Sequence, residues 1–416
     1  MSFPKNTLPS PPPLLDELVP GWPADAAAEP TAQRAWARRL FRRYERPPLP
    51  PGARYALHLG LFVLTLLTTT LAGVALVREG PGYLALDVFG LPAALRQQQL
   101  NWGLAFAVPF LGVLAVHEFG HYFVARLNRV RTSLPYFLPV PFGLGTFGAV
   151  IRIKERIFSR REFFDIGLAG PLAGLLVAVP LLAYAFATLP DPVEYVFGLR
   201  PALAPYPPPE FTLAQPLLYQ LLEKLFADPS RVPPANQLLH YPLLLAGEMS
   251  LFFTALNLLP IGQLDGGHIL YGLLGVRRAG RLSAVLFVAF IFYAGLGIFS
   301  LHSSWQTWLY GGLPYALYLW LVLRKLLPRP RQVLAVAGAV WVGQLAVATL
   351  WPGVPGEPGW LLFGLLLGRV SGIYHPPAPD ETPLSWKRQA LGWLLVVLFG
   401  LCFSPSPLAA VRWAAI

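Results

Sequence analysis

The sequence predicts an all-α polytopic membrane protein, on the evidence of its composition and of its repeated apolar stretches. Of the 416 residues, 55% are hydrophobic and only 13% are charged, and the mean hydropathy is +0.52. Counting the 38 glycines as apolar raises the apolar share to about 64%, against about 45–50% in a soluble protein. A soluble globule lacks the charged cover for so much apolar surface, and a disordered chain needs low hydrophobicity, so both classes are excluded.

Apolar stretches of membrane-spanning length recur along the whole chain. A spanning helix needs about 20 mostly apolar residues and would contact the lipid bilayer along its length. The eighth stretch is short and the ninth contains Pro405 and Pro407, so either could be re-entrant or broken. The nine predicted spans are 54–77, 102–126, 163–189, 240–260, 281–301, 304–324, 332–351, 358–371 and 388–411.

Basic residues flank these spans on one side. The chain has 32 Lys and Arg against 21 Asp and Glu, a net charge of +11. Alternating spans would bring all the basic clusters to one face, and such residues stay in the cytoplasm. We therefore expect a multi-pass protein with a cytoplasmic N-terminus, in a bacterial inner membrane or an organelle membrane descended from one, and no nucleic-acid partner. The clusters lie within 42–46, 126–131, 152–161, 277–281 and 324–331.

Three further segments are unlike the spans. Residues 1–50 are rich in proline and have no apolar core of a signal peptide; within them, 34–43 could form a basic surface helix or simply a positive flank. The apolar segment 133–150 has too many Pro and Gly for a helix, so we expect a re-entrant hairpin covered by the bundle. Residues 190–239 are predicted to be an extramembrane loop with a short helix at 211–227.

The second span contains the sequence His117-Glu118-Phe119-Gly120-His121. Histidines at i and i+4 lie on one helix face and can bind the same metal ion, while the glutamate between them can act as a general base. Ionisable residues inside a membrane helix are costly and mark a function by default. A chance match is the alternative, and it is rare in a chain with only 7 histidines.

A catalytic zinc ion needs a third protein ligand and keeps one position for water. Asp265 lies at the end of the fourth predicted span, at the same depth as the histidines of the second span, and a glycine pair follows it. His268 is the competing ligand, or else a residue that supports the site from behind or an interfacial histidine. The residues alone favour Asp265 as the third ligand and do not exclude His268.

These two motifs together resemble the site-2 protease family of intramembrane metalloproteases. The resemblance covers about residues 101–280 and rests on HEFGH followed by Asn-x-x-Pro-x-x-x-Leu-Asp-Gly-Gly from Asn257. The segment PYFLPVPFGLGTFGAVI, residues 135–151, is similar to the bacterial relatives of the plastid EGY proteins. The resemblance implies a three-helix zinc metalloprotease core at 101–280, after a proline-rich segment (1–50) and a first span with its outer loop (51–100), and before C-terminal membrane helices (281–416).

The resemblance also implies a role for each matching residue. One Zn²⁺ per chain would be bound by His117, His121 and Asp265, and Glu118 would activate its water. Asn257 would face the active site and hydrogen-bond the substrate or the developing oxyanion, although it could instead only pack the helix. The strip Gly145-Thr146-Phe147-Gly148 would belong to a hairpin that binds an unwound substrate strand.

The sequence therefore predicts an intramembrane endopeptidase that hydrolyses a peptide bond in or near a transmembrane segment of a membrane protein. A non-proteolytic metal-binding scaffold or chaperone of the same fold is the alternative, which the intact Glu118 disfavours. A zinc transporter is disfavoured because no series of acids and histidines crosses the membrane. A homo-oligomer or a regulatory membrane partner stays open. The glycines near Asp165, among them Gly167 and Gly170, favour close helix packing, and Cys402 is expected to be buried and inert.

Overall fold

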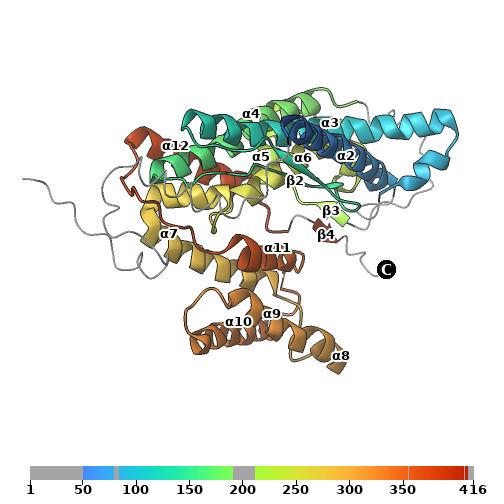
Figure 1. The fold of residues 1–416 in the computed structure, drawn as a ribbon. Coiled ribbons are helices and arrows are strands. Elements are labelled where there is room, and N and C mark those ends of the chain that lie inside the picture. The colour runs from blue at the N-terminus through green and yellow to red at the C-terminus, as the bar shows by residue number, and fades with distance from the viewer. Residues whose placement is uncertain (1–49, 79–83, 191–210, 355, 407, 411–416) are drawn as a thin grey trace, which may run out of the picture. The chain divides into compact units, whose positions relative to one another are not determined.

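The computed structural model describes residues 50–78, 84–190, 211–354, 356–406 and 408–410. From Pro51 onward these residues form one compact unit in which helices dominate (Figure 1). Short 3-10 helices cover Leu86–Gly90 and Ala235–His240, and π-helical turns cover Trp308–Gly312 and Leu367–Ser371. The helices are α2 (Pro51–Arg78), α3 (Ala93–Leu127), α4 (Arg160–Ala187), α5 (Leu217–Phe226), α6 (Pro242–Leu258), α7 (Asp265–Ala294), α8 (Trp305–Thr307), α9 (Leu313–Leu323), α10 (Pro330–Leu350), α11 (Trp360–Leu366) and α12 (Trp386–Cys402).

Four helices of the described residues are long and apolar enough to cross a membrane, namely α2, α3, α4 and α10. Two shorter apolar helices, Pro242–Leu258 and Trp360–Ser371, lie where two further spans were predicted. The prediction of an all-α polytopic membrane protein is confirmed. The basic stretch 34–43 lies outside the described residues.

Several predicted boundaries are wrong. The stretch 281–301 is only the second half of α7, which begins at Asp265 and ends at Ala294, before Gly297 with a φ of 77°. The stretch 388–411 ends as a helix at Cys402, because a proline such as Pro405 cannot continue the ladder of backbone hydrogen bonds. Cys402 itself is buried, as predicted.

The predicted helix at 211–227 is a strand followed by a shorter helix. Strand β3 (Phe211–Leu213) precedes α5 and pairs antiparallel with β4 (Leu408–Ala410). The sequence analysis did not predict this small sheet, because its two strands are three residues long and almost 200 positions apart in the chain.

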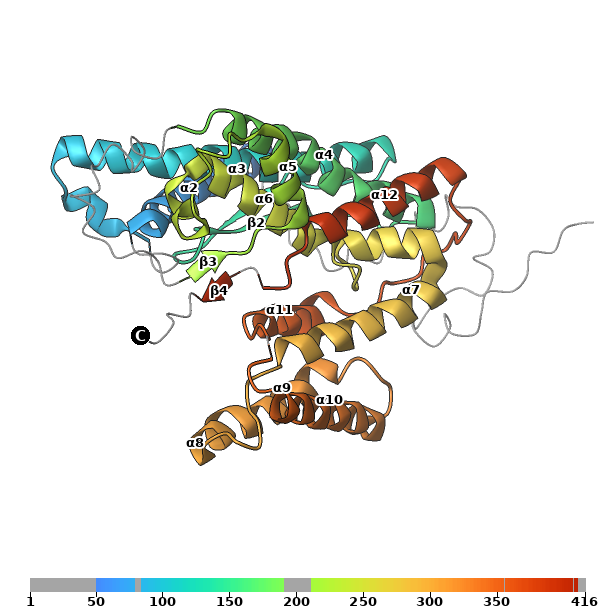
Figure 2. The same cartoon turned by 180° about the vertical axis from the view of Figure 1, so that it is seen from behind.

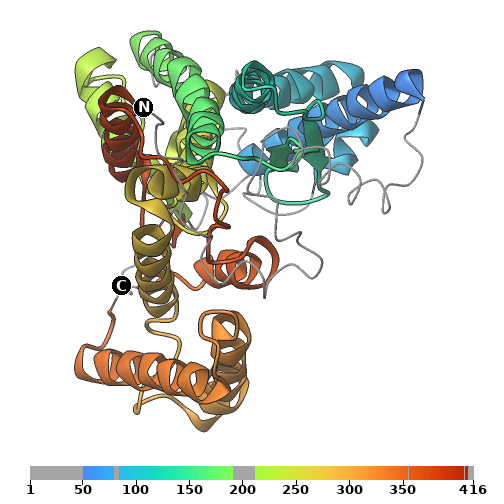
Figure 3. The same cartoon turned by 60° about the vertical axis from the view of Figure 1, so that its left-hand side comes forward.

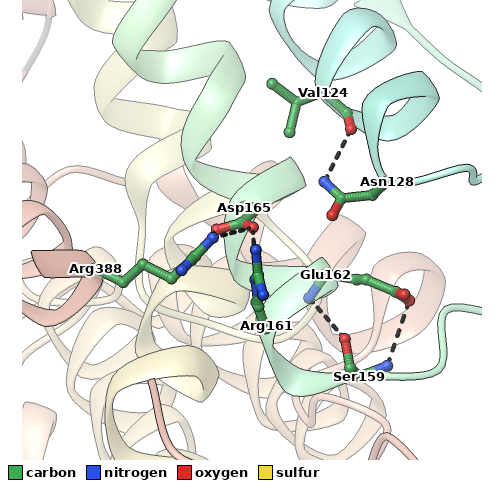
Figure 4. Close-up of polar contacts among 7 residues, drawn as sticks. All are labelled: Val124, Asn128, Ser159, Arg161, Glu162, Asp165 and Arg388. Atoms are coloured by element: carbon green, nitrogen blue, oxygen red, sulfur yellow. Dashed lines mark hydrogen bonds and ion pairs between the residues drawn. The ribbon is translucent and has the colours of Figure 1, made fainter. Parts of the chain in front are cut away.

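Helix α4 lies at the centre of the helices that carry the sequence motifs. α4 packs against α3, α6 and α7, and α12 runs alongside α6 and α7 (Figure 2). Glycines permit the closest approaches: a methyl group on Gly120 of α3 would lie 2.6 Å from the carbonyl oxygen of Ala169 on α4. A capping box starts α4, where Ser159 accepts from the backbone N–H of Glu162 and the Glu162 carboxylate accepts from that of Ser159 (Figure 4).

The proline- and glycine-rich segment after α3 is a β-hairpin, as predicted. Strand β1 (Tyr136–Pro139) pairs antiparallel with β2 (Thr146–Val150). The hairpin lies beside α2 (Figure 3), where the Thr68 hydroxyl donates to the carbonyl of Gly145 at 2.7 Å. Helix α2 therefore holds the turn of the hairpin through a side chain.

Candidate active site

The HEFGH residues lie in the second half of α3, and their polar side chains point into the protein. His117, Glu118 and His121 are only 4%, 7% and 6% exposed. The i, i+4 spacing puts both imidazoles on one face of the helix, where their Nε2 atoms are 3.1 Å apart. The energetic cost of burying three such groups requires partners for them, and these come from α7 and α4.

Asp265 is the first residue of α7 and reaches both imidazoles. Its Oδ2 atom lies 3.2 Å from His117 Nε2 and 3.2 Å from His121 Nε2. The turn that delivers it requires glycine: Gly262 has a φ of 62°, and a methyl group on Gly266 would overlap the carbonyl of Leu258. In the described part of the chain, His117, His121 and Asp265 are the one set of three His, Cys, Asp or Glu donors close enough to share a metal ion.

The geometry of these three donors fits a zinc ion. Bonds of about 2.1 Å in a tetrahedron separate neighbouring ligand atoms by roughly 3.4 Å, close to the 3.1–3.2 Å observed. His121 Nδ1 lies 2.7 Å from the carbonyl oxygen of Ile166 and donates to it, which leaves the Nε2 lone pair facing the other two donors. Two nitrogens and one carboxylate also leave a fourth position for water, as in catalytic zinc sites.

Helix α4 closes the back of this donor set. A methyl group on Gly170 would overlap the imidazole of His121, and one on Gly167 would overlap the side chain of His268. The glycines after Asp165 therefore permit close packing, as predicted, and they pack directly against histidines.

Two other predicted residues, Glu118 and Asn257, lie near the donors. The backbone N–H of Ile151, just after β2, donates to the Glu118 carboxylate. Asn257 is in the last turn of α6, with its Nδ2 atom 3.4 Å from His117 Nε2. His268 stands outside the donor set, and its Nδ1 atom lies 2.7 Å from Nε2 of His375.

The four predicted hairpin residues face in different directions. Gly145 packs on the backbone of α2, and the buried Thr146 hydroxyl bonds within the hairpin, to Leu138 and Gly148. Gly148 has a φ of 91° and faces the Phe253 ring of α6. Only Phe147 presents a large exposed side chain, with 62% of its surface accessible.

Sequence reasoning missed the contacts that reach this region from beyond α11. His375 bonds His268, and Arg388 forms an ion pair with Asp165. No local pattern marks either residue. An arginine at the start of an apolar stretch is typical of the positive flank of a membrane span. Only the fold shows that the side chain of Arg388 contacts Asp165 instead.

A buried His-His-Asp donor set among membrane helices is the arrangement of a membrane-embedded metallopeptidase. Comparison with known families agrees, since residues 105–301 match the model of peptidase family M50. The chain thus carries a peptidase M50, or site-2 protease, domain and is a homologue of the EGY zinc metalloproteases.

Similar proteins come from plants. The chain is 30% identical over 255 residues to "Probable zinc metalloprotease EGY1, chloroplastic" of Arabidopsis thaliana, covering 58% of this chain and 44% of that protein. It is 32% identical over 245 residues to the protein of the same name from Oryza sativa subsp. japonica, covering 57% and 41%. The chain thus matches less than half the length of these curated relatives. No solved structure matches.

Proposed function

We propose that this protein is a zinc-dependent intramembrane endopeptidase. The observation that carries the proposal is the convergence of two imidazole nitrogens and one carboxylate oxygen within 3.1–3.2 Å of one another. Their helices belong to a polytopic membrane protein with a peptidase M50 domain. The plant relatives are named as probable zinc metalloproteases, which supports zinc as the ion.

Each side chain has a role in this mechanism. His117, His121 and Asp265 would hold the zinc ion, which when bound supplies Lewis acidity to the scissile carbonyl and to the attacking water. Glu118 accepts the proton of that water on its carboxylate and delivers it to the nitrogen of the leaving amine. The Nδ2 group of Asn257 donates a hydrogen bond to the substrate carbonyl as negative charge develops on it.

The substrate we propose is a membrane protein with an unwound transmembrane segment. A helical substrate shields its own peptide bonds, and an exposed hairpin edge can hold an extended strand by backbone hydrogen bonds. Gly145, Thr146, Phe147 and Gly148 would form that edge. We further propose that the active site opens toward the cytoplasm of a bacterial inner membrane, since the basic clusters Arg126–Arg131 and Arg277–Arg281 follow the two metal-binding motifs.

The zinc content of the protein and a variant of the proposed general base, Glu118, test this function. The purified full chain should contain about one zinc per molecule, and His117→Ala should lose it. Glu118→Gln should keep the zinc but lose cleavage of a fluorophore-quencher transmembrane peptide by at least about 100-fold, since the base is gone. Asp265→Ala should lose zinc, whereas His268→Ala should still bind about one zinc per molecule when zinc is saturating.

The opposite outcomes are equally informative. A folded wild-type protein without zinc contradicts the metal site. Normal cleavage by Glu118→Gln contradicts the assigned base. Zinc lost in His268→Ala but kept in Asp265→Ala would exchange their roles. Zinc binding without cleavage of any membrane peptide would favour the alternative of a non-proteolytic metal-binding scaffold.

A further inference from the structure

The segment from residue 372 to residue 388, between α11 and the first turn of α12, runs along the N-terminal ends of α4 and α7; we call it the strap. We propose that the strap is a positioning element that holds the first half of α7, so that Asp265 stays beside His117 and His121. This inference rests on the proposed function. The strap lies outside the segment that matches the peptidase family, residues 105–301.

The first half of α7 needs such support because the helix is interrupted. Gly275 has a φ of 74° and a ψ of 167°, which breaks the run of helical dihedrals ten residues after Asp265. The interrupted turn is held from the side by Arg160, whose Nε donates to the carbonyl of Gly272 at 3.0 Å. Arg160 is buried and also donates to the strap, at the carbonyl of Glu381, at 3.5 Å. A ten-residue helical segment gains little stability by itself, so these lateral contacts fix its position.

The middle of the strap is bound to the helical turn that follows Asp265. His375 Nδ1 donates to the carbonyl of Pro376 at 2.6 Å, so its Nε2 atom carries the lone pair. His268 Nδ1 therefore donates to His375 Nε2 at 2.7 Å. Burial lowers the pKa of His375 to about 3, which keeps this ring neutral and able to accept. Phe163 of α4 stacks on the His268 ring.

Tyr271 provides a second anchor one turn further along α7. Its hydroxyl donates to the carboxylate of Glu381 at 2.5 Å and accepts from the backbone N–H of Ala378 at 2.9 Å. Its ring stacks on His375 with 4.0 Å between the ring centroids. Three strap residues thus contact one buried tyrosine that lies six positions after Asp265.

The end of the strap is bound to α4, next to the residue that bonds the metal ligand His121. Arg388 forms two parallel hydrogen bonds to the Asp165 carboxylate, of 2.7 and 3.0 Å (Figure 4). The next residue, Ile166, supplies the carbonyl that accepts from His121 Nδ1. Partners behind a metal-bound histidine fix its orientation and affect metal affinity about 10- to 100-fold. The strap therefore contacts both α7, which carries Asp265, and α4, which bonds His121.

Zinc affinity of the full chain in detergent tests this positioning role. His375→Ala and Arg388→Gln should each weaken zinc binding about 10-fold or more in competition with a chelator. The matched control is Arg331→Gln, an exposed arginine on α10, which should leave the affinity unchanged. In the metal-free protein, backbone amides of 265–274 should exchange hydrogen faster in the two strap variants than in the wild type, while those of α10 should not.

Conservative variants separate positioning from general stability. His375→Gln keeps an acceptor and Arg388→Lys keeps the charge, so both should recover part of the zinc affinity with the helical content unchanged. Affinities within twofold of wild type in folded His375→Ala and Arg388→Gln would overturn the proposal and leave the zinc peptidase function intact. Faster exchange throughout the molecule would also overturn it, because the strap would then only stabilise the fold. If Arg388→Gln does not fold, the comparison of His375→Ala with His375→Gln decides.

Discussion

The donor set and the hairpin are built in opposite ways. The two histidines of the donor set are buried, and glycines of α4 enclose them so closely that a methyl group on Gly170 would overlap His121. The hairpin carries exposed aromatic side chains, Phe142 and Phe147, while its other side packs on α2, where the Thr68 hydroxyl bonds Gly145 and the His58 ring bonds the carbonyl of Pro135. The proposed chemistry thus depends on a fixed, enclosed arrangement, whereas the proposed substrate binding depends on the exposed side of the hairpin.

The largest effect is expected where the enclosure is tightest. Gly170→Ala should displace the His121 imidazole, because the new methyl group has no free space and the contacting atoms belong to a ligand held by its own hydrogen bond. We expect zinc affinity to fall at least about 10-fold and cleavage to fall with it. Zinc titration of the purified protein measures the first and the fluorescent peptide assay the second.

Gly174→Ala is the matched control for this variant. Gly174 lies one turn further along α4, and a methyl group there would meet His117 at an ordinary contact distance of 3.4 Å. Zinc binding should therefore remain within about twofold of wild type, because no ligand has to move. Equal losses in both variants would mean that the tight glycine packing is not what holds the ligands.

A smaller effect is expected at the attachment of the hairpin. Thr68→Val keeps the shape of the side chain but removes the donor to the Gly145 carbonyl. That carbonyl still accepts from the backbone N–H of Val140, so the loss is that of one ordinary hydrogen bond, about 0.5–1.5 kcal/mol. We expect kcat/KM for the peptide to fall about 10-fold while zinc content stays at the wild-type level. Thr188→Val is the control, since it removes an exposed hydroxyl bond at the C-terminal end of α4. Loss of zinc in Thr68→Val would show that the two regions are not independent.

The sequence predicted the donor set better than its surroundings. His117 and His121 follow from helical periodicity alone, and Asp265 follows from the equal depth of two spans. The hairpin follows from the proline and glycine content of 133–150. The bond between His268 and His375 joins residues 107 positions apart, and the ion pair of Asp165 and Arg388 joins residues 223 apart. Such pairs are set by how helices and loops pack, which no local pattern encodes.

The smallest effect is expected at the open edge itself. The Phe147 ring is 62% exposed and contacts Phe142, so its removal costs little in folding and affects mainly what the ring would cover in a bound strand. Burying part of that ring against a substrate is worth about 1 kcal/mol, so Phe147→Ala should raise KM about fivefold and leave kcat and zinc content unchanged. Phe89→Ala, at a phenylalanine that is 51% exposed, should change neither constant. A fall in kcat without a change in KM would mean that Phe147 acts on the donor set, and the contrast between a fixed chemical centre and an open binding edge would then not hold.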